Sequence, residues 1–394
     1  MADLRDFGFR DHPFAMVPKS GITNWSGMAR QRALLHDIVE SVLTIETGLS
    51  EFVILHGSYG AGKSHALKYL SHEISETKRD HFRSIAIYLP KIRVDQKVDF
   101  VRLYKAIMRE LGRDFFMDLA SKIDSLIDTA ATGLGNQMNR EQERAIIRDD
   151  PQHFRKKIIE SIGPEDRQTV ELFRMLSTSG SPDKVLTYLL EGKPTIGPAG
   201  FSQAIDNDYV ATKMLSNIFR AMTLEIEGQE SAYRAVYLFI DEVEDIWDLK
   251  PIEQMAIWNG LRELLNRVPE NLCLLLAFTG DAALLEATIP QALAERTSRQ
   301  NIELQSLEIH EAKDFIEEHL ASFRREDYTA SQPYYPFSEE AIDYVLETAT
   351  ILVPRRIFRA LRTVLERSIR HEGLNPGDEI SARMAEDIFS VMGV

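Results

Sequence analysis

The segment from Gly57 to Ser64 has residue types and a spacing that could hold a phosphate group. It reads Gly57-Ser58-Tyr59-Gly60-Ala61-Gly62-Lys63-Ser64 and fits the pattern G-x-x-x-x-G-K-[ST]. Its glycines let main-chain N–H groups turn inward around an anion, and a helix that follows adds partial positive charge. We expect Lys63 to reach the β- and γ-phosphates of a nucleotide and the Ser64 hydroxyl to ligate Mg²⁺. This phosphate loop therefore predicts a site for ATP and Mg²⁺.

Two adjacent carboxylates, Asp241 and Glu242, directly follow the apolar run Val236–Ile240. At the end of a strand, two neighbouring side chains can take different tasks. We expect Asp241 to organise Mg²⁺ and its waters, and Glu242 to act as the base that orients or deprotonates the attacking water. The alternative is a solvated acidic loop, which is our expectation for Glu244 and Asp245.

A parallel sheet is the element that must position both groups. Four short apolar runs predict its buried strands, and Ile302–Leu307 alternates more and predicts an edge strand. The four runs are Phe52–His56, Ile85–Leu89, Val236–Ile240 and Leu272–Phe278. The phosphate loop follows the first strand and precedes a helical stretch, Lys63–Ile74. Strands that alternate with helices indicate an α/β fold in three layers.

Two other regions are predicted to be helical. Lys63 and Asp241 lie 178 positions apart, and a helical insertion at about residues 98–222 accounts for this long separation between the two motifs. Its predicted helices are Val98–Leu111, Gln152–Ile162, Val170–Ser177 and Val210–Met222. Glycine-containing connectors are expected at Thr129–Asn136 and Glu191–Phe201, as plain links or as loops that contact a partner.

After Leu307 the pattern becomes entirely helical, which predicts a small C-terminal lid. Its predicted helices are Glu311–Phe323, Ser338–Ala349, Arg355–His371 and a last one near Ser381–Met392. The expected domains are therefore an N-terminal arm at 1–50, an α/β core at 51–308 and a helical lid at 309–394.

Composition restricts the function further. The chain of 394 residues has 46 basic and 61 acidic side chains, and its net charge of −15 opposes non-specific adhesion to DNA or to an anionic membrane. Any contact with DNA must be local.

The chain has one cysteine, Cys273, so a disulfide within the chain is excluded, and its apolar neighbours predict that it is buried. No segment approaches the roughly 18 apolar residues of a membrane helix, so we expect a cytoplasmic protein. The ten histidines lack the spacing of metal ligands.

The order of these features resembles the AAA+ ATPases: phosphate loop, acidic pair, a strand ending in a polar residue, an arginine segment and a helical lid. The resemblance implies that Thr279 is the polar sensor near the γ-phosphate, with Asp281 a weaker candidate and helix capping the alternative. Segment 294–299 is similar to the one that supplies an arginine finger to the neighbouring subunit in clamp-loader-like members. Arg299 fits that spacing better than Arg296, and either could instead be a surface arginine.

Two weaker resemblances imply further site residues. The Pro354-Arg355 pair is similar to the lid arginine that touches the γ-phosphate in branch-migration motors, which implies that role for Arg355. The other arginines of that helix form either a solvated face or a basic surface for a phosphate backbone. The segment from Asp6 to Leu34 resembles the start of initiator-type ATPases (origin-recognition and cell-division-control), and also secretion-type and transposon-type members. That likeness implies that Val17 and Pro18 line an adenine pocket, and ordinary packing is the alternative.

The resemblance implies an ATPase that assembles with itself in the presence of ATP, as a ring or filament, and acts on DNA or a DNA-acting partner. Mobile elements and anti-phage defence are settings for such proteins. Initiators usually append a winged-helix DNA-binding domain, for which we expect no room after the lid, and the insertion has no counterpart in the family. A second hypothesis is a nucleotide-dependent switch that binds a protein effector and no nucleic acid. A small-molecule kinase is a third, which explains neither the lid arginine nor the finger segment.

Overall fold

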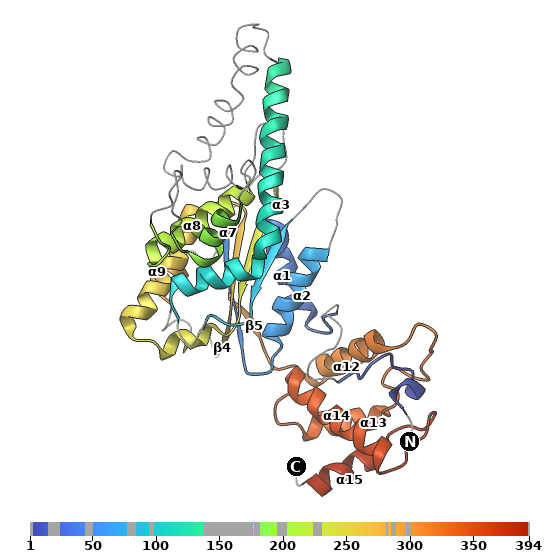
Figure 1. Cartoon of the computed structure of the whole chain (residues 1–394). Helices are drawn as coiled ribbons and strands as arrows, with labels where there is room; N and C mark the ends of the chain where they lie inside the picture. The colour runs from blue at the N-terminus through green and yellow to red at the C-terminus, as the bar shows by residue number, and fades with distance from the viewer. Residues whose placement is uncertain are drawn as a thin grey trace.

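The computed structural model describes residues 3–14, 24–43, 50–76, 84–93, 98–137, 176, 182–194, 203–223, 231–280, 283–284, 289–295 and 301–392. Within them, a five-stranded parallel sheet forms the centre of an α/β core (Figure 1). The strands are β1 (Glu51–Gly57), β2 (Ile85–Leu89), β3 (Val236–Ile240), β4 (Leu272–Thr279) and β5 (Ile302–Leu304). The predicted parallel sheet is confirmed, with β5 at its edge.

The strand order is β2-β3-β4-β1-β5, so β4 lies between β1 and β3. Gly57 at the end of β1 is in register with Thr279 at the end of β4, and Ile240 at the end of β3 is in register with Leu276. The carboxyl ends of parallel strands meet at one edge of the sheet. The chain therefore brings the ends of β1, β3 and β4 together, although they lie far apart in sequence.

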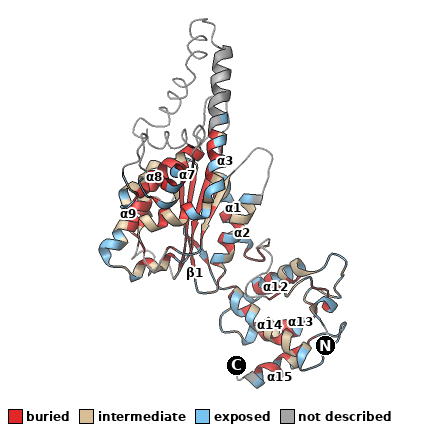
Figure 2. Ribbon diagram, viewed as in Figure 1, coloured by how far each residue is buried: buried red, intermediate tan, exposed pale blue. Residues whose placement is uncertain are grey.

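Helices cover both faces of the sheet and complete the three predicted layers (Figure 1). Alternate residues of each strand face opposite sides: Phe52 and Ile54 pack toward α3, α8 and α9, while Val53 and Leu55 pack toward α1 and α2. β1, β3 and β4 are buried along nearly their whole length, while β2 and β5 are only partly buried (Figure 2). The covering helices are α1 (Ala29–Ser41), α2 (Lys63–Glu76), α3 (Phe100–Gln137), α7 (Pro182–Glu191), α8 (Asp208–Met222) and α9 (Pro251–Arg267).

Between β2 and β3 the described part of the chain contains the helices α3, α7 and α8 and no strand, with short non-helical stretches between them. The prediction of a connector at Thr129–Asn136 is wrong, because α3 continues through these residues to Gln137. Isolated glycines cost a helix only about 1 kcal/mol each, so Gly133 and Gly135 do not end it. The helical backbone conformation of α3 is instead interrupted by a kink at Gly112, with φ 76° and ψ 174°. The helix at 182–191 was not predicted, and the predicted Gln152–Ile162 lies outside the described residues.

The C-terminal part forms four helices, and the N-terminal residues pack against them rather than against the sheet (Figure 1). The helices are α12 (Ile309–Phe323), α13 (Glu339–Thr348), α14 (Pro354–Arg370) and α15 (Ala382–Met392). The short helix η1 (Leu4–Phe7) leads into a segment whose Phe9 pairs with Arg324 and whose Phe14 ring lies 5.7 Å from that of Phe358. The domain boundaries remain predictions. Among the described helices, none has the length and apolar character needed to cross a membrane.

Candidate nucleotide-binding site

The phosphate loop begins where β1 ends and stops where α2 begins. Its three glycines have positive φ, of 150° at Gly57, 86° at Gly60 and 104° at Gly62. A Cβ at Gly57 would lie 2.4 Å from the carbonyl oxygen of Leu304, so the neighbouring strand requires glycine there. A Cβ at Gly62 would meet nothing within 4 Å, so open space lies beside this turn. The loop therefore leaves room for a ligand at the N-terminus of α2, where helix amides favour an anion.

Lys63 is directed into this loop. Its side chain is 7% exposed, and its ammonium donates hydrogen bonds to the carbonyls of Gly57 at 2.9 Å and Ser58 at 3.0 Å. Burial lowers the pKa of Lys63, and the negative charges of Glu244 and Asp241 oppose that shift. The structure therefore brings the loop lysine and the acidic residues after β3 into one electrostatic environment. Ser64 is exposed on the first turn of α2, while Ala61 is buried.

Asp241 is held firmly at the end of β3. Its side chain is 3% exposed, and its two carboxylate oxygens accept hydrogen bonds from the Tyr88 hydroxyl at 3.1 Å and the Glu242 N–H at 2.9 Å. Burial raises the pKa of the Tyr88 hydroxyl, as do the charges of Asp241 and Glu242. Tyr88 therefore acts as a donor that orients the carboxylate. The sequence analysis missed this residue, since a tyrosine near the end of a strand carries no specific signal.

Glu242 has a different environment from its neighbour. It is exposed and adopts a left-handed backbone conformation, with φ 48°, at the start of the helix η2 (Val243–Asp248). Partial loss of hydration raises the pKa of Glu242, and the nearby charges of Asp241, Glu244 and Asp245 raise it further. A carboxylate with a raised pKa accepts a proton more readily, which suits a general base.

The expectation that Glu244 and Asp245 form a solvated acidic loop is wrong. Glu244 is partly buried and accepts a hydrogen bond of 3.1 Å from the main-chain N–H of Thr279. Asp245 forms an ion pair of 3.0 Å with Arg93, which follows β2. The short helix η2 directs both carboxylates back toward the sheet. Such a helix could not be predicted from the acidic sequence, which is equally typical of an exposed loop.

The lid reaches the phosphate loop through Arg355, on the first turn of α14. Its main-chain N–H donates to the Gly60 carbonyl at 3.2 Å, and its guanidinium donates to the Tyr59 hydroxyl at 2.6 Å. The guanidinium carbon also lies 4.7 Å from the centre of the Tyr59 ring, in a cation–π arrangement. A Cβ at Gly60 would lie 2.8 Å from the Cβ of Arg355, so a glycine permits this approach. The predicted lid arginine is therefore in contact with the predicted phosphate loop.

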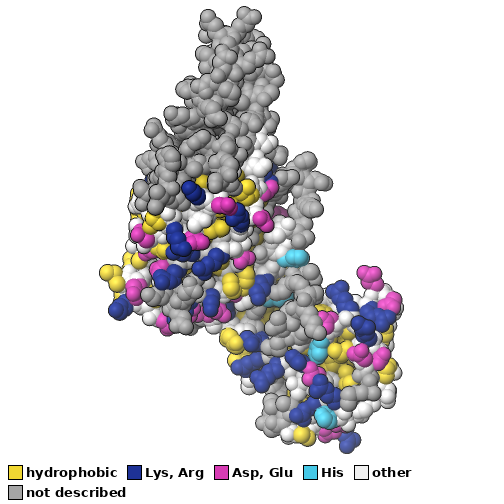
Figure 3. All heavy atoms as spheres, in the orientation of Figure 1, with side chains coloured by type: hydrophobic (Ala, Val, Ile, Leu, Met, Phe, Trp, Pro, Cys, Tyr) yellow, Lys and Arg dark blue, Asp and Glu magenta, His cyan; other side chains and the backbone are white. Residues whose placement is uncertain are grey.

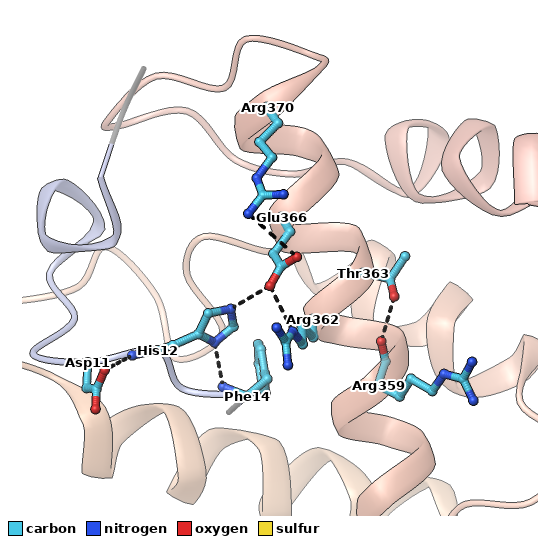
Figure 4. Close-up of polar contacts among 8 residues, drawn as sticks. All are labelled: Asp11, His12, Phe14, Arg359, Arg362, Thr363, Glu366 and Arg370. Carbon is cyan, nitrogen blue, oxygen red and sulfur yellow. Dashed lines mark hydrogen bonds and ion pairs between the residues drawn. The ribbon is translucent and has the colours of Figure 1, made fainter. Parts of the chain in front are cut away.

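Two histidines tie the N-terminal part of the chain to the core and to the lid. His65 on α2 donates from Nε2 to the Asn24 carbonyl at 2.8 Å, and His319 on α12 donates to the Pro13 carbonyl at 2.6 Å. Burial among aromatic rings lowers the pKa of His319 to about 4. His12 is also held, 3.3 Å from Glu366 of α14 (Figure 4). The described N-terminal residues therefore contact both α2, which follows the phosphate loop, and the lid.

Several predicted site residues lie outside the described residues. These are Val17 and Pro18 of the adenine pocket, Asp281, and the two finger candidates Arg296 and Arg299. Of the remaining predicted residues, the structure brings the phosphate loop, Asp241, Glu242, Thr279 and Arg355 to one edge of the sheet. The buried Cys273, whose pKa burial raises, lies within β4 and takes no part in this edge.

Comparison with known proteins gives an independent view of the fold. The family model described as "BREX system ATP-binding protein BrxC/D" matches residues 15–178, a range that contains the phosphate loop. The ORC2 protein of Aeropyrum pernix in ADPNP-ADP complexes is similar in structure, with 14% identity, a TM-score of 0.54, and coverage of 97% of this chain and 72% of that chain. Its ADP form gives 13% identity, a TM-score of 0.51, and coverage of 97% and 73%. No curated protein matches the sequence.

Proposed function

Because the chain has the AAA+ P-loop fold of the initiator type, we propose that it binds and hydrolyses ATP at the edge of the sheet where β1, β3 and β4 end. The observation that supports this proposal most directly is the environment of Lys63. Its buried ammonium is held inside a loop of positive-φ glycines and is influenced by Asp241 and Glu244 across the edge. Such a combination binds phosphate next to a metal.

The chain's own residues divide the chemistry between them. Lys63 and the amides at the start of α2 would bind the phosphates, and Ser64 with Asp241 would hold Mg²⁺, which neutralises charge on the phosphates when bound. Mg²⁺ typically takes one or two protein ligands together with phosphate oxygens, so two such residues fit it. Tyr88 orients Asp241. Glu242 would take the proton from the attacking water.

Arg355 and Thr279 are proposed to sense the γ-phosphate. Gly57 lies opposite Thr279 in the sheet, and Arg355 is hydrogen-bonded to the loop residue Gly60. A phosphate in the loop would offer the Arg355 guanidinium a stronger partner than the neutral Tyr59 hydroxyl. Tyr59 would therefore hold Arg355 ready beside the site.

Replacing Tyr59, which is 70% exposed, tests whether it positions Arg355. We expect Tyr59→Ala to lower the ATPase kcat several-fold with little change in KM, because it removes both the hydrogen bond and the ring. Tyr59→Phe keeps the ring and should retain most of the activity. Steady-state kinetics with Arg355→Ala as reference measure the effect. Wild-type kcat in both Tyr59→Ala and Arg355→Ala would remove the proposed role.

Assembly and biological setting belong to the same proposal. The match to the BREX family model supports a role in anti-phage defence. ATP-dependent self-assembly and action on DNA or a DNA-acting partner are proposed from the resemblance of the motifs to those of initiator-type AAA+ ATPases. Arg299, or Arg296, would complete the site of a neighbouring subunit. The alternative is a nucleotide-dependent switch that binds a protein effector and no nucleic acid, which the net charge of −15 favours.

Particle size measured with and without ATP, and then with duplex or single-stranded DNA, tests this part of the proposal. We expect the ATP-bound chain to form larger particles than the nucleotide-free chain, and DNA to raise its ATPase rate. A DNA-indifferent rate, together with co-purification of an effector protein, would favour the switch. A chain that stays monomeric with ATP in every mixture would contradict the assembly.

A further inference from the structure

Helix α14 concentrates positive charge in a chain that is otherwise acidic. It contains six arginines and one acidic residue, Glu366, whereas the whole chain has a net charge of −15. The arginines are Arg355, Arg356, Arg359, Arg362, Arg367 and Arg370. Figure 3 shows Lys and Arg side chains gathered over this part of the lid. Among these arginines, Arg355 is engaged with the phosphate loop, which leaves five to explain.

Four of them share one side of the helix. At 3.6 residues per turn, Arg356, Arg359, Arg367 and Arg370 fall within one sector, and we call this sector the arginine face. It extends about 21 Å along the helix axis at 1.5 Å per residue. The opposite side of α14 is buried in the lid through Ile357, Leu361, Val364 and Leu365. That packing covers most of the apolar surface of α14, so little of it remains for insertion into a lipid membrane.

Some arginines of α14 form ion pairs with an acidic side chain, and others do not. Glu366 pairs with Arg362 at 2.8 Å and lies 4.0 Å from Arg370, and it also contacts His12 (Figure 4). Arg359 points away from this cluster in the same view. Within the described part of the chain, no ion pair joins Arg356, Arg359 or Arg367 to an acidic side chain. The arginine face therefore keeps most of its charge available.

Stabilisation of the helix itself does not explain these residues. Positive charge is favourable near the C-terminus of a helix, which accounts for Arg367 and Arg370. Arg356 lies in the first turn, where the helix dipole makes positive charge unfavourable, and Arg359 lies in the second turn, where the dipole contributes little. These two exposed arginines are not stabilised by the dipole and pair with no acidic side chain among the described residues, which indicates a ligand outside the chain.

We infer that the arginine face of α14 binds the phosphodiester backbone of DNA. This inference rests on the proposed action on DNA and names the surface responsible. All basic residues of α14 are arginine, whose planar guanidinium binds phosphate with two parallel hydrogen bonds. Duplex DNA carries one negative charge per about 1.7 Å of its axis, so a face of about 21 Å meets several phosphates. The net charge of −15 opposes non-specific adhesion of DNA to the rest of the chain.

The same helix connects DNA with the nucleotide site. Arg355, at the start of α14, touches Tyr59 and Gly60 of the phosphate loop, and the arginine face continues from the next residue. A helix moves as a rigid element, so a shift of Arg355 toward a bound phosphate would move the whole face. DNA affinity is therefore expected to depend on the bound nucleotide.

The salt dependence of DNA binding tests the inference. Fluorescence anisotropy would follow the full chain on labelled duplex and single-stranded DNA between roughly 50 and 200 mM salt. The test variant is Arg359→Gln/Arg367→Gln, and the charge-matched control is Arg30→Gln/Lys184→Gln, at exposed positions of α1 and α7. Loss of two phosphate contacts should make the slope of log affinity against log salt shallower by about 1.8 on duplex and about 1.4 on single strands. The control should keep the wild-type slope.

Each outcome decides between the inference and the function on which it rests. A test variant with the wild-type slope and affinity would overturn the arginine face as the DNA-binding surface. The same holds if the wild-type chain binds ATP but neither form of DNA, or if only anionic vesicles or an acidic protein bind in an arginine-dependent way. A wild-type chain that fails to bind ATP would instead overturn the proposed function. ATP affinity is therefore measured in every preparation.

Discussion

Replacing Lys63 with alanine is expected to lower the affinity for ATP by about 100-fold or more. The ammonium lies inside the phosphate loop, where it would make charge-assisted hydrogen bonds to two phosphate groups. Hydrogen bonds to charged groups contribute about 1.5 to 3 kcal/mol each, and each 1.4 kcal/mol is a tenfold change in affinity. Isothermal titration calorimetry with ATP in the presence of Mg²⁺ measures the loss.

Lys68→Ala is the matched control, because Lys68 lies on the same helix and is exposed. It should bind ATP as the wild type does. Circular dichroism would check that the Lys63 variant remains folded, since its removal leaves the Gly57 and Ser58 carbonyls without this donor. A folded Lys63→Ala chain with unchanged ATP affinity would exclude the phosphate loop as the nucleotide site.

The sheet could be predicted because its strands are short and apolar, and because β1, β3 and β4 are buried on both faces. β2 and β3 have the predicted bounds, and β1 and β4 differ by one or two residues at their ends. The glycine turn between β1 and α2 could be predicted for a similar reason, since its glycines satisfy local backbone requirements. What could not be predicted was the strand order, which depends on contacts between segments far apart in sequence. That order is what brings Asp241 opposite the loop.

The contacts around the site were harder to predict than the site itself. Glu244 was expected to be solvated, yet the short helix η2 directs it to the Thr279 N–H. The contact between Tyr59 and Arg355 joins residues nearly 300 positions apart, and the packing of residues 3–14 on the lid joins opposite ends of the chain. Local sequence carries no signal for such pairs. Gly133 and Gly135 were misleading because glycine favours loops only on average, and a helix tolerates it.

Replacing Glu242 with glutamine is expected to lower kcat for ATP hydrolysis by about 100-fold or more while ATP still binds. Glutamine has the same shape but accepts no proton, and general-base catalysis typically contributes about 10²- to 10⁴-fold. Lys63 and the loop amides remain in place, so affinity should change little. The variant should therefore accumulate the ATP-bound assembly, visible as larger particles by light scattering. Single-turnover hydrolysis measures the chemical step directly.

Glu244→Gln distinguishes the two neighbouring acids, because glutamine at this position can still accept the hydrogen bond from the Thr279 N–H. We expect it to retain far more activity than Glu242→Gln. Since the negative charge of Glu244 raises the pKa of Glu242, its removal should also shift the acid limb of the rate profile to lower pH. A base must be deprotonated, so the wild-type rate should rise with pH through a limb above the ordinary glutamate value of 4.5. If Glu242→Gln turns over freely while Glu244→Gln is inactive, Glu244 is the base, and the water must then be activated next to Thr279 at the end of β4.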